Sequence, residues 1–294
     1  MNKRIQNQSD HGRSAQDRRS TEIRLLNDEL REARQQLANY RDTLVTIQRA
    51  MLPQRLPRVP GLDLAVHFAD ADGVGGDFYD VRPVASGRWA IVIADVIGHG
   101  LGAAAILAVV HALGNAVDRQ RVMAEPSAAL ALVNGPLATR YLADTGKFVT
   151  AFVGLYDADV QVLTYASAAH PPPRLVRGNA VRRLDDVSGL PLGLDRTSAY
   201  EQSSLHLRPG DRLVLFTDGV TESMNSARSL FGDERLDAIL PAPVNSAQEL
   251  LNRVTSSVRT FRGGRPAGDD ETCLIAFVKP IEATVQGESE VVRC

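Results

Sequence analysis

The sequence of 294 residues contains few of the features that mark several common classes of protein. Its two cysteines, Cys273 and Cys294, are too few for a disulfide framework and lack the spacing of a zinc site, which favours a reducing cytoplasm. The 33 Lys and Arg residues nearly balance the 35 Asp and Glu residues, so the net charge of -2 provides no basic surface for nucleic acid. No stretch of about eighteen consecutive apolar residues occurs, which predicts no membrane insertion. We therefore expect a cytoplasmic protein that recognises its partners through specific chemistry.

What the sequence does contain is four short acidic segments, each placed where a strand-like apolar run begins or ends. An apolar run over 89–94 leads to Asp95, and another over 213–216 leads to Asp218. Since adjacent strands can bring their ends together, we expect these carboxylates to gather, where they would repel one another unless a cation lies among them. Hard divalent cations prefer such oxygen ligands, whereas the alternative is that each Asp merely forms a turn. The segments are residues 75–78, 94–100, 216–219 and 268–272.

An apolar repeat with alternating spacings of three and four residues runs through the N-terminal part of the chain. This is the a/d pattern of a heptad repeat, and polar residues fill the positions between. We expect residues 20–52 to form a coiled-coil helix that pairs two chains; the alternative is a single amphipathic helix lying on its own domain. Residues 1–19 lack the repeat, and we expect them to be disordered. The repeat consists of Ile23, Leu26, Leu30, Ala33, Leu37, Tyr40, Leu44, Ile47 and Met51.

The pattern changes at Pro53, Pro57 and Pro60, after which short apolar runs alternate with turns rich in Gly, Pro and Asp. We expect residues 53–280 to form one domain and 281–294 a flexible tail. Strands in hairpins with a few helices predict an α+β fold, in which two antiparallel β-sheets pack as a sandwich flanked by α-helices. Strands are expected over 62–69, 78–84, 88–96, 147–156, 161–168, 175–176, 203–207, 212–217 and 272–278, and helices over 101–117, 126–142 and 247–261.

Six short motifs follow one another along this second region. They are Val74-Gly-Gly-Asp-Phe-Tyr-Asp80, Asp95-Val-Ile-Gly-His-Gly100, Ala169-His-Pro-Pro-Pro173, Gly189-Leu-Pro-Leu-Gly193, Phe216-Thr-Asp-Gly-Val-Thr-Glu222 and Asp269-Asp-Glu-Thr272. Together they resemble the PPM-type metal-dependent serine/threonine phosphatases, in the bacterial SpoIIE/RsbU branch. The resemblance spans about residues 50–280 with the motifs in order. It implies a PPM phosphatase-like sandwich with two Mn²⁺ or Mg²⁺ ions in a cleft at one end.

Carried over position by position, the resemblance implies a set of metal ligands built from carboxylates and one backbone carbonyl. Asp95 would bridge both ions, and the Val96 carbonyl with Asp77 would complete the shell of one ion. Two such ions activate water and clamp the phosphoryl oxygens, so the reaction needs no protein nucleophile.

Asp218 and Asp269 would hold the other ion. Asp270 competes with Asp269 for this role, because the sequence alone does not separate two adjacent carboxylates. The implied catalytic residues are Asp77, Asp95, Asp218 and Asp269, and the implied metal ligands are Asp77, Asp95, Val96, Asp218, Asp269 and Asp270.

Two histidines lie in these motifs. His99 is a candidate general acid for the leaving alkoxide, and the alternative is a residue that shapes the loop after Asp95. His170 precedes three prolines, and we expect it to be a hydrogen-bonded turn residue. Ser167 and Ala169 depart from the Asn-Ala-Gly-His usual in this branch, which affects the expected loop geometry and not the metal site. The glycines expected to permit turns near the ions are Gly75, Gly76, Gly98 and Gly100.

Two hypotheses of function follow. In the first, the protein is an enzyme that hydrolyses phosphoserine or phosphothreonine, and the resemblance implies a phosphorylated STAS-domain anti-sigma-factor antagonist as the substrate in a partner-switching pathway. In the second, it is a catalytically weak scaffold that binds phosphoproteins and is dimerised by its coiled coil. The four intact acidic segments favour catalysis. We also expect a homodimer through residues 20–52 and a regulatory protein acting upstream.

Overall fold

The structure is a computed structural model that describes residues 2–71, 73–98, 100–116 and 125–280, with side chains from Ile23 onward. The chain divides into two units, residues 1–46 and 47–294. No helix within the described ranges is both long and apolar enough to cross a bilayer. The predicted tail, 281–294, and the candidate acid His99 lie outside the described residues.

The first helix, α1 (Asn2–Met51), runs without a break through the heptad segment, as the apolar repeat predicts. Large apolar side chains of the repeat, among them Leu30 and Leu37, are exposed. The helix begins at Asn2, which differs from the disorder expected over 1–19. Polar residues can extend a helix that is already nucleated, because adding a residue costs less than starting a helix. The pairing of two chains through this helix stays a prediction.

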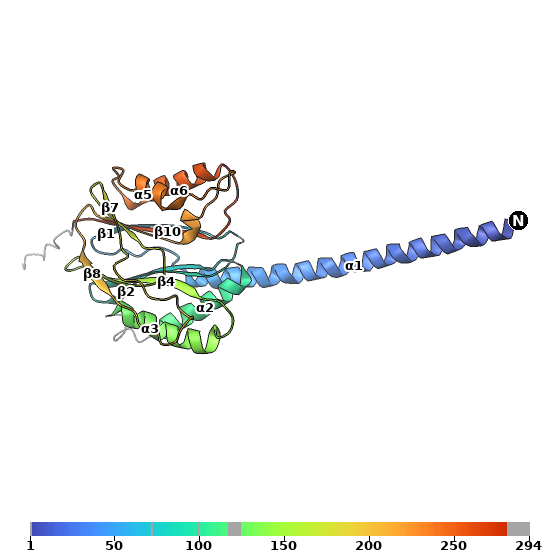
Figure 1. Cartoon of the computed structure of the whole chain (residues 1–294), viewed down its shortest axis with the longest axis horizontal. Coiled ribbons are helices and arrows are strands. Elements are labelled where there is room, and N and C mark those ends of the chain that lie inside the picture. Colours follow the sequence, from blue (N-terminus) through green and yellow to red (C-terminus); the bar gives the residue numbers. More distant parts are fainter. Residues whose placement is uncertain (1, 72, 99, 117–124, 281–294) are drawn as a thin grey trace, which may run out of the picture. The chain divides into compact units, whose positions relative to one another are not determined.

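Among the described residues of the second unit, two antiparallel sheets of five strands each pack face to face (Figure 1). This confirms the sandwich that the hairpin pattern predicts. The first sheet has the order β1 (Leu62–Ala69), β10 (Glu271–Val278), β9 (Arg212–Phe216), β6 (Arg174–Arg177) and β7 (Ala180–Arg183). The second sheet has the order β2 (Asp77–Ala85), β3 (Arg88–Val96), β4 (Val149–Asp157), β5 (Val162–Ala168) and β8 (Ser203–His206).

Helices cover the outer face of each sheet (Figure 1). Helices α2 (Leu101–Ala116) and α3 (Pro126–Pro136) lie on the second sheet, and α5 (Gly232–Ile239) and α6 (Ala247–Arg262) lie on the first. Ser246 is the N-cap of α6 and accepts from the Glu249 amide at 3.1 Å, and Glu249 accepts in turn from the amide of Asn245, the residue before the cap, at 2.9 Å. The helix ends at Gly263 with a φ of 63°, a left-handed conformation that glycine adopts without strain.

The apolar runs of the strands are explained by burial on both faces of each sheet. Tyr79 packs between the sheets, whereas its neighbour Phe78 packs beneath α2. Leu215 and Phe216 divide in the same way between the central core and the core beneath α6. Successive side chains of a strand point to opposite faces, so a strand covered on both sides must be apolar throughout.

Three short elements and one helix boundary differ from the sequence prediction. Strand β7, helix α4 (Asp218–Thr221) and helix α5 were not predicted, since each has too few residues to show a period. The predicted helix over 126–142 ends as α3 at Pro136 and continues as a π-helical turn over Leu137–Tyr141. In that turn the Leu142 amide donates to the Leu137 carbonyl at 2.8 Å, a wider turn that follows a proline without an amide hydrogen.

Candidate metal centre

The strand register places the first two acidic segments side by side. Asp77, the first residue of β2, lies opposite Asp95 near the end of β3. Asp95 lies in turn opposite Thr150 on β4. Two carboxylates from different segments therefore meet at one edge of the second sheet, as the position of Asp at strand ends predicts.

The other two segments lie at the same end of the first sheet. Strand β9 runs directly into Thr217 and Asp218, and its neighbour β10 starts directly after the 269–270 pair. Hydrogen bonds from Thr217 and Thr272 to Asp77 connect this edge to the second sheet. The fold therefore brings all four acidic segments to one end of the sandwich.

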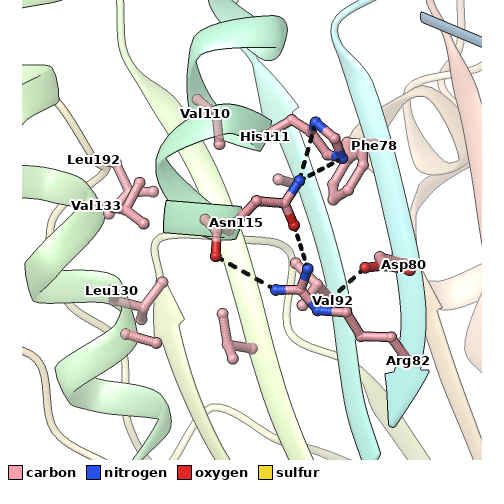
Figure 2. A pocket seen from close by; sticks show the side chains of 15 residues that line it. Phe78, Asp80, Arg82, Val92, Val110, His111, Asn115, Leu130, Val133 and Leu192 are labelled. Atoms are coloured by element: carbon pink, nitrogen blue, oxygen red, sulfur yellow. Dashed lines mark hydrogen bonds and ion pairs between the residues drawn. The ribbon is translucent and has the colours of Figure 1, made fainter. Parts of the chain in front are cut away.

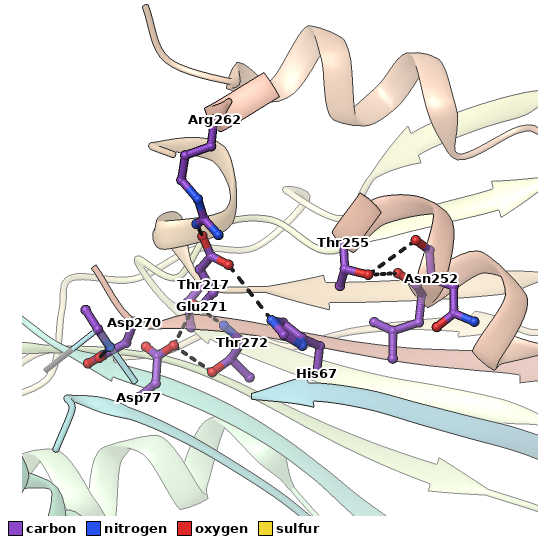
Figure 3. A network of polar contacts seen from close by, with 11 residues as sticks. His67, Asp77, Thr217, Asn252, Thr255, Arg262, Asp270, Glu271 and Thr272 are labelled. Carbon is purple, nitrogen blue, oxygen red and sulfur yellow. Dashed lines mark hydrogen bonds and ion pairs between the residues drawn. The ribbon is translucent and has the colours of Figure 1, made fainter. Parts of the chain in front are cut away.

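Asp77 is held from the opposite sheet (Figure 3). Its side chain is buried, and its Oδ2 accepts hydrogen bonds from the Thr217 hydroxyl at 2.7 Å and the Thr272 hydroxyl at 2.6 Å. Burial raises the pKa of Asp77 well above its ordinary value, the charge of Asp95 raises it further, and the two hydroxyl donors oppose the shift. The fold thus holds a carboxylate where its charge is unfavourable unless a cation is added.

The remaining carboxylates interact with one another through charge. Burial raises the pKa of Asp95 to about 7, and the negative charges of Asp218, Asp269 and Asp270 add to the shift. Burial likewise raises the pKa of Asp218 to about 6, with further contributions from Glu222 and Asp269. Mutual repulsion across all four segments is the electrostatic pattern of an anionic pocket that a cation would neutralise.

The adjacent carboxylates Asp269 and Asp270 have different surroundings. Asp270 is buried, its Oδ1 accepts from the Ala71 amide at 2.9 Å, and its Oδ2 accepts from the Gly76 amide at 2.7 Å. Asp269 is only partly buried, and its Oδ1 accepts from the amide of Asp270 at 2.9 Å. Asp270 therefore fastens the segment before β2 to the start of β10, a structural task that the sequence does not reveal.

Three glycines allow these segments to approach closely. A Cβ atom at Gly75 would lie 2.1 Å from a carboxylate oxygen of Asp270, and one at Gly219 would lie 1.9 Å from the Asp270 carbonyl oxygen. A Cβ atom at Gly76 would lie 2.7 Å from the carbonyl oxygen of Val96. A side chain at any of these positions would clash with a neighbouring atom. For Gly75 and Gly76 this reason for glycine differs from the expected one, a turn conformation. The absence of a side chain at residue 76 also leaves space beside the Val96 carbonyl.

The donor atoms of this site suit a hard cation, because they are carboxylate and carbonyl oxygens. Within the described residues, no three His, Cys, Asp or Glu side chains already form a group that could hold a metal ion. The strand register places these carboxylates near one another, and their charges act on one another. Binding an ion therefore requires their side chains to turn toward it. The residues present fit Mn²⁺ or Mg²⁺ by chemistry and by net negative charge.

His170 is a buried structural residue, as its sequence context predicts. Its Nδ1 lies 2.9 Å from the hydroxyl of Thr150. Burial lowers the pKa of His170 to about 3, so the ring is neutral at physiological pH. The loop after Asp95 turns through Gly98 and Gly100, whose φ angles are 87° and 79°, as expected for glycines at turns.

A cavity of about 210 Å³ opens beside Asp269. The sequence gives no signal for its cationic residue, Arg265, because the loop that carries it has no periodic pattern. The same holds for the hydroxyls of Thr217 and Thr272, which lie inside motifs but carry no signal of their partner. The cavity is lined by Gly219, Glu222, Ser223, Met224, Arg265, Pro266, Gly268 and Asp269.

A second, mostly apolar cavity of about 80 Å³ lies between the second sheet and helices α2 and α3 (Figure 2). At its rim the Arg82 guanidinium donates to the side-chain oxygen of Asn115, and its Nε lies 3.5 Å from Oδ2 of Asp80. The side-chain nitrogen of Asn115 contacts the ring of His111. None of the predicted metal ligands lines this cavity. The cavity is therefore separate from the acidic site, and its rim groups bind one another.

Comparison with known proteins decides the family. The family model for Stage II sporulation protein E (SpoIIE) matches residues 85–279, about two thirds of the chain. The chain belongs to the SpoIIE family. The matched residues of this SpoIIE-family chain include Asp95, Asp218 and Asp269, whereas Asp77 lies just before them.

Individual relatives agree with the family match. Phosphoserine phosphatase RsbU of Bacillus subtilis is 29% identical over 232 residues, covering 78% of this chain and 67% of RsbU. Protein IcfG of Synechocystis sp. is 27% identical over 257 residues, covering 79% of this chain but only 40% of IcfG. Among solved structures, the SiaA-PP2C domain of Pseudomonas aeruginosa superposes with a TM-score of 0.75 at 24% identity, over 84% of this chain and 99% of that domain. The sandwich of this SpoIIE-family chain is therefore a PP2C-like fold.

Proposed function

We propose that this chain is a metal-dependent protein serine/threonine phosphatase that hydrolyses phosphoserine or phosphothreonine. The observation that carries the proposal is the gathering of carboxylates from four acidic segments at one end of a SpoIIE-family sandwich. Two relatives support it. RsbU is named a phosphoserine phosphatase, and the catalytic domain of PstP, a solved structure with a TM-score of 0.55 and 18% identity, is described in complex with two manganese ions.

Asp95 takes the central place in the proposed ligand set. It lies opposite Asp77 in the strand register, and the charges of the other segments act on it. We assign Asp95 to both Mn²⁺ or Mg²⁺ ions, with Asp77 and the Val96 carbonyl on one of them. Two such ions, when bound, supply the positive charge that activates water and stabilises the phosphoryl oxygens. The carboxylates of this chain hold and orient that charge.

Asp218 and Asp269 hold the second ion in this proposal. Asp269 is preferred over Asp270, because both oxygens of Asp270 accept backbone amides while Asp269 is partly exposed beside the 210 Å³ cavity. Asp270 then keeps the segment before β2 in register with the ligands. The guanidinium of Arg265 on the cavity wall offers a positive charge to an incoming phosphate.

The proposed substrate is a phosphorylated STAS-domain protein in a partner-switching pathway, as the motif resemblance implies. We further propose a homodimer formed through residues 20–52, because apolar side chains of the heptad repeat such as Leu30, Leu37 and Tyr40 are exposed on α1. A regulatory protein acting upstream and a cytoplasmic location complete the proposal; the location rests on cysteine usage. The second candidate, a catalytically weak phosphoprotein scaffold, is favoured only if the site binds metal without turnover.

The test is release of phosphate from a phosphoserine protein with saturating Mn²⁺. Asp95→Asn and Asp218→Asn should each lower the rate to less than about a tenth of wild type, because several kcal/mol of charge stabilisation are lost. Circular dichroism should show an unchanged fold for both variants. Hydrolysis of p-nitrophenyl phosphate separates an enzyme from a scaffold. Faster release from phosphotyrosine peptides than from any phosphoserine or phosphothreonine protein would refute the assigned substrate class.

A further inference from the structure

Two buried threonines each donate a hydrogen bond to the same oxygen of Asp77 (Figure 3). Thr217 and Thr272 are both fully buried, and their hydroxyls lie 2.7 Å and 2.6 Å from the same Oδ2 atom. The remaining oxygen, Oδ1, receives neither of these hydrogen bonds. Two hydroxyl groups, one just after β9 and one at the start of β10, therefore donate to a single oxygen of one carboxylate.

The backbone around the threonines fixes the direction of the hydrogen bond from Thr217. The Thr217 hydroxyl oxygen accepts the amide hydrogen of Thr272 at 3.1 Å, and the Thr217 amide donates to the Thr272 carbonyl at 3.0 Å. The hydroxyl of Thr217 thus uses its oxygen as an acceptor and has its hydrogen free to donate to Asp77. With a donor on each side, Oδ2 acts as an acceptor only.

The position of each threonine in the chain connects it to the proposed ligands. Thr217 directly precedes Asp218, and Thr272 follows Asp269 by three residues. Asp77 belongs to the opposite sheet. The hydroxyl pair therefore links the carboxylate of one sheet to the strand ends that carry the carboxylates of the other sheet.

We propose that Thr217 and Thr272 are positioning residues that hold Asp77 by Oδ2 and thereby present Oδ1 to the metal ion. This inference rests on the proposed function, since it requires Asp77 to be a ligand. Hydrogen bonds from such supporting groups fix the orientation of a ligating carboxylate and stabilise its ionised form. Neither threonine touches the ion or the substrate.

The first test compares Thr272→Val with Thr272→Ser in the full-length chain. Valine matches threonine in shape and removes only the hydroxyl, while serine keeps it. Titration with Mn²⁺ by isothermal calorimetry should show that Thr272→Val lowers the affinity for Mn²⁺ by about 10-fold to 100-fold. This is the range seen when such supporting groups are lost. Thr272→Ser should bind Mn²⁺ as the wild type does.

A role in folding alone predicts a different result. In that case Thr272→Val has a lower melting temperature but wild-type affinity for Mn²⁺, which overturns the inference. If Thr272→Val does not fold, Thr217→Val and Thr217→Ser replace it, with the same expected difference. Failure of both valine variants to fold also overturns the inference, because the hydroxyls then serve the fold itself.

The proposed function fails independently of this inference. A wild type that binds no Mn²⁺ and releases no phosphate from a phosphoserine protein contradicts the function. A wild type that does both, with Thr272→Val unchanged in Mn²⁺ affinity, contradicts only the role of the threonines.

Discussion

Replacing Gly219 by alanine tests how tightly the acidic segments must pack. The added Cβ atom would lie 1.9 Å from the carbonyl oxygen of Asp270 and 2.9 Å from its carbonyl carbon. Real Cβ contacts essentially never fall below 3.0 Å, so the two segments must separate by at least 1.1 Å, the difference between 3.0 and 1.9. Both contacts are with backbone, so no flexible side chain can yield to relieve them.

This separation should cost both stability and activity. Insertion of a carbon into a packed site typically costs about 1–3 kcal/mol of the free energy of unfolding. Asp269 adjoins the displaced Asp270 backbone, and a misplacement of about 1 Å can lower a rate by about 100-fold. We therefore expect Gly219→Ala to fold, to bind Mn²⁺ more weakly, and to lose about 100-fold in phosphate release.

The matched control is Gly114→Ala in α2, where no atom outside the helix's own backbone and the neighbouring residues lies within 4 Å of the added Cβ. That variant should keep wild-type activity and gain about 0.5–1 kcal/mol of stability, because glycine weakens a helix interior. Urea denaturation measures the stability of both variants, and Mn²⁺ titration measures metal binding. If Gly219→Ala matches the wild type in Mn²⁺ affinity and in rate, the close approach of the segments has no bearing on the site.

Three further predictions concern charge, burial and pairing. The pKa of Asp95 is raised from 3.8 to about 7, so its ionisation destabilises the metal-free fold increasingly as pH rises from about 4 to 7. In EDTA, urea denaturation should show Asp95→Asn more stable than wild type at neutral to alkaline pH, with the difference vanishing near pH 4; a constant difference would contradict this. Arg174 is fully buried and paired with Asp233 and Asp237, whose carboxylates stay partly exposed, so Arg174→Met should lose about 1.5–3 kcal/mol of unfolding free energy, the contribution of hydrogen bonds to charged groups, while Mn²⁺ affinity stays unchanged. Leu30→Asp with Leu37→Asp should convert a homodimer into a monomer in light scattering and alter turnover of the protein substrate; a wild type that is already monomeric at micromolar concentrations would exclude the coiled-coil dimer.

The long elements and the positions of the acidic segments could be predicted from the sequence for one physical reason. Strands buried on both faces must be apolar, so β3 and β9 are visible as runs, and the Asp residues stand at their ends. Strand β7 and helix α5 are short, so the local pattern carries too little signal.

Contacts between distant segments could not be predicted in the same way. The hydroxyls of Thr217 and Thr272 reach Asp77 across sequence separations of 140 and 195 residues, and no local pattern encodes such a contact. The difference between Asp269 and Asp270 also arises only when the segment before β2 folds against β10. Sequence therefore indicates which groups gather, while the fold decides which oxygen each one presents.

The most direct test of the metal centre is a crystal structure of the wild-type chain grown with Mn²⁺ and measured at the manganese absorption edge. We expect two anomalous peaks about 3.5–4 Å apart, with Asp95 touching both ions, Asp77 on one and Asp218 with Asp269 on the other. An absence of bound manganese, or manganese bound away from Asp95, would contradict it.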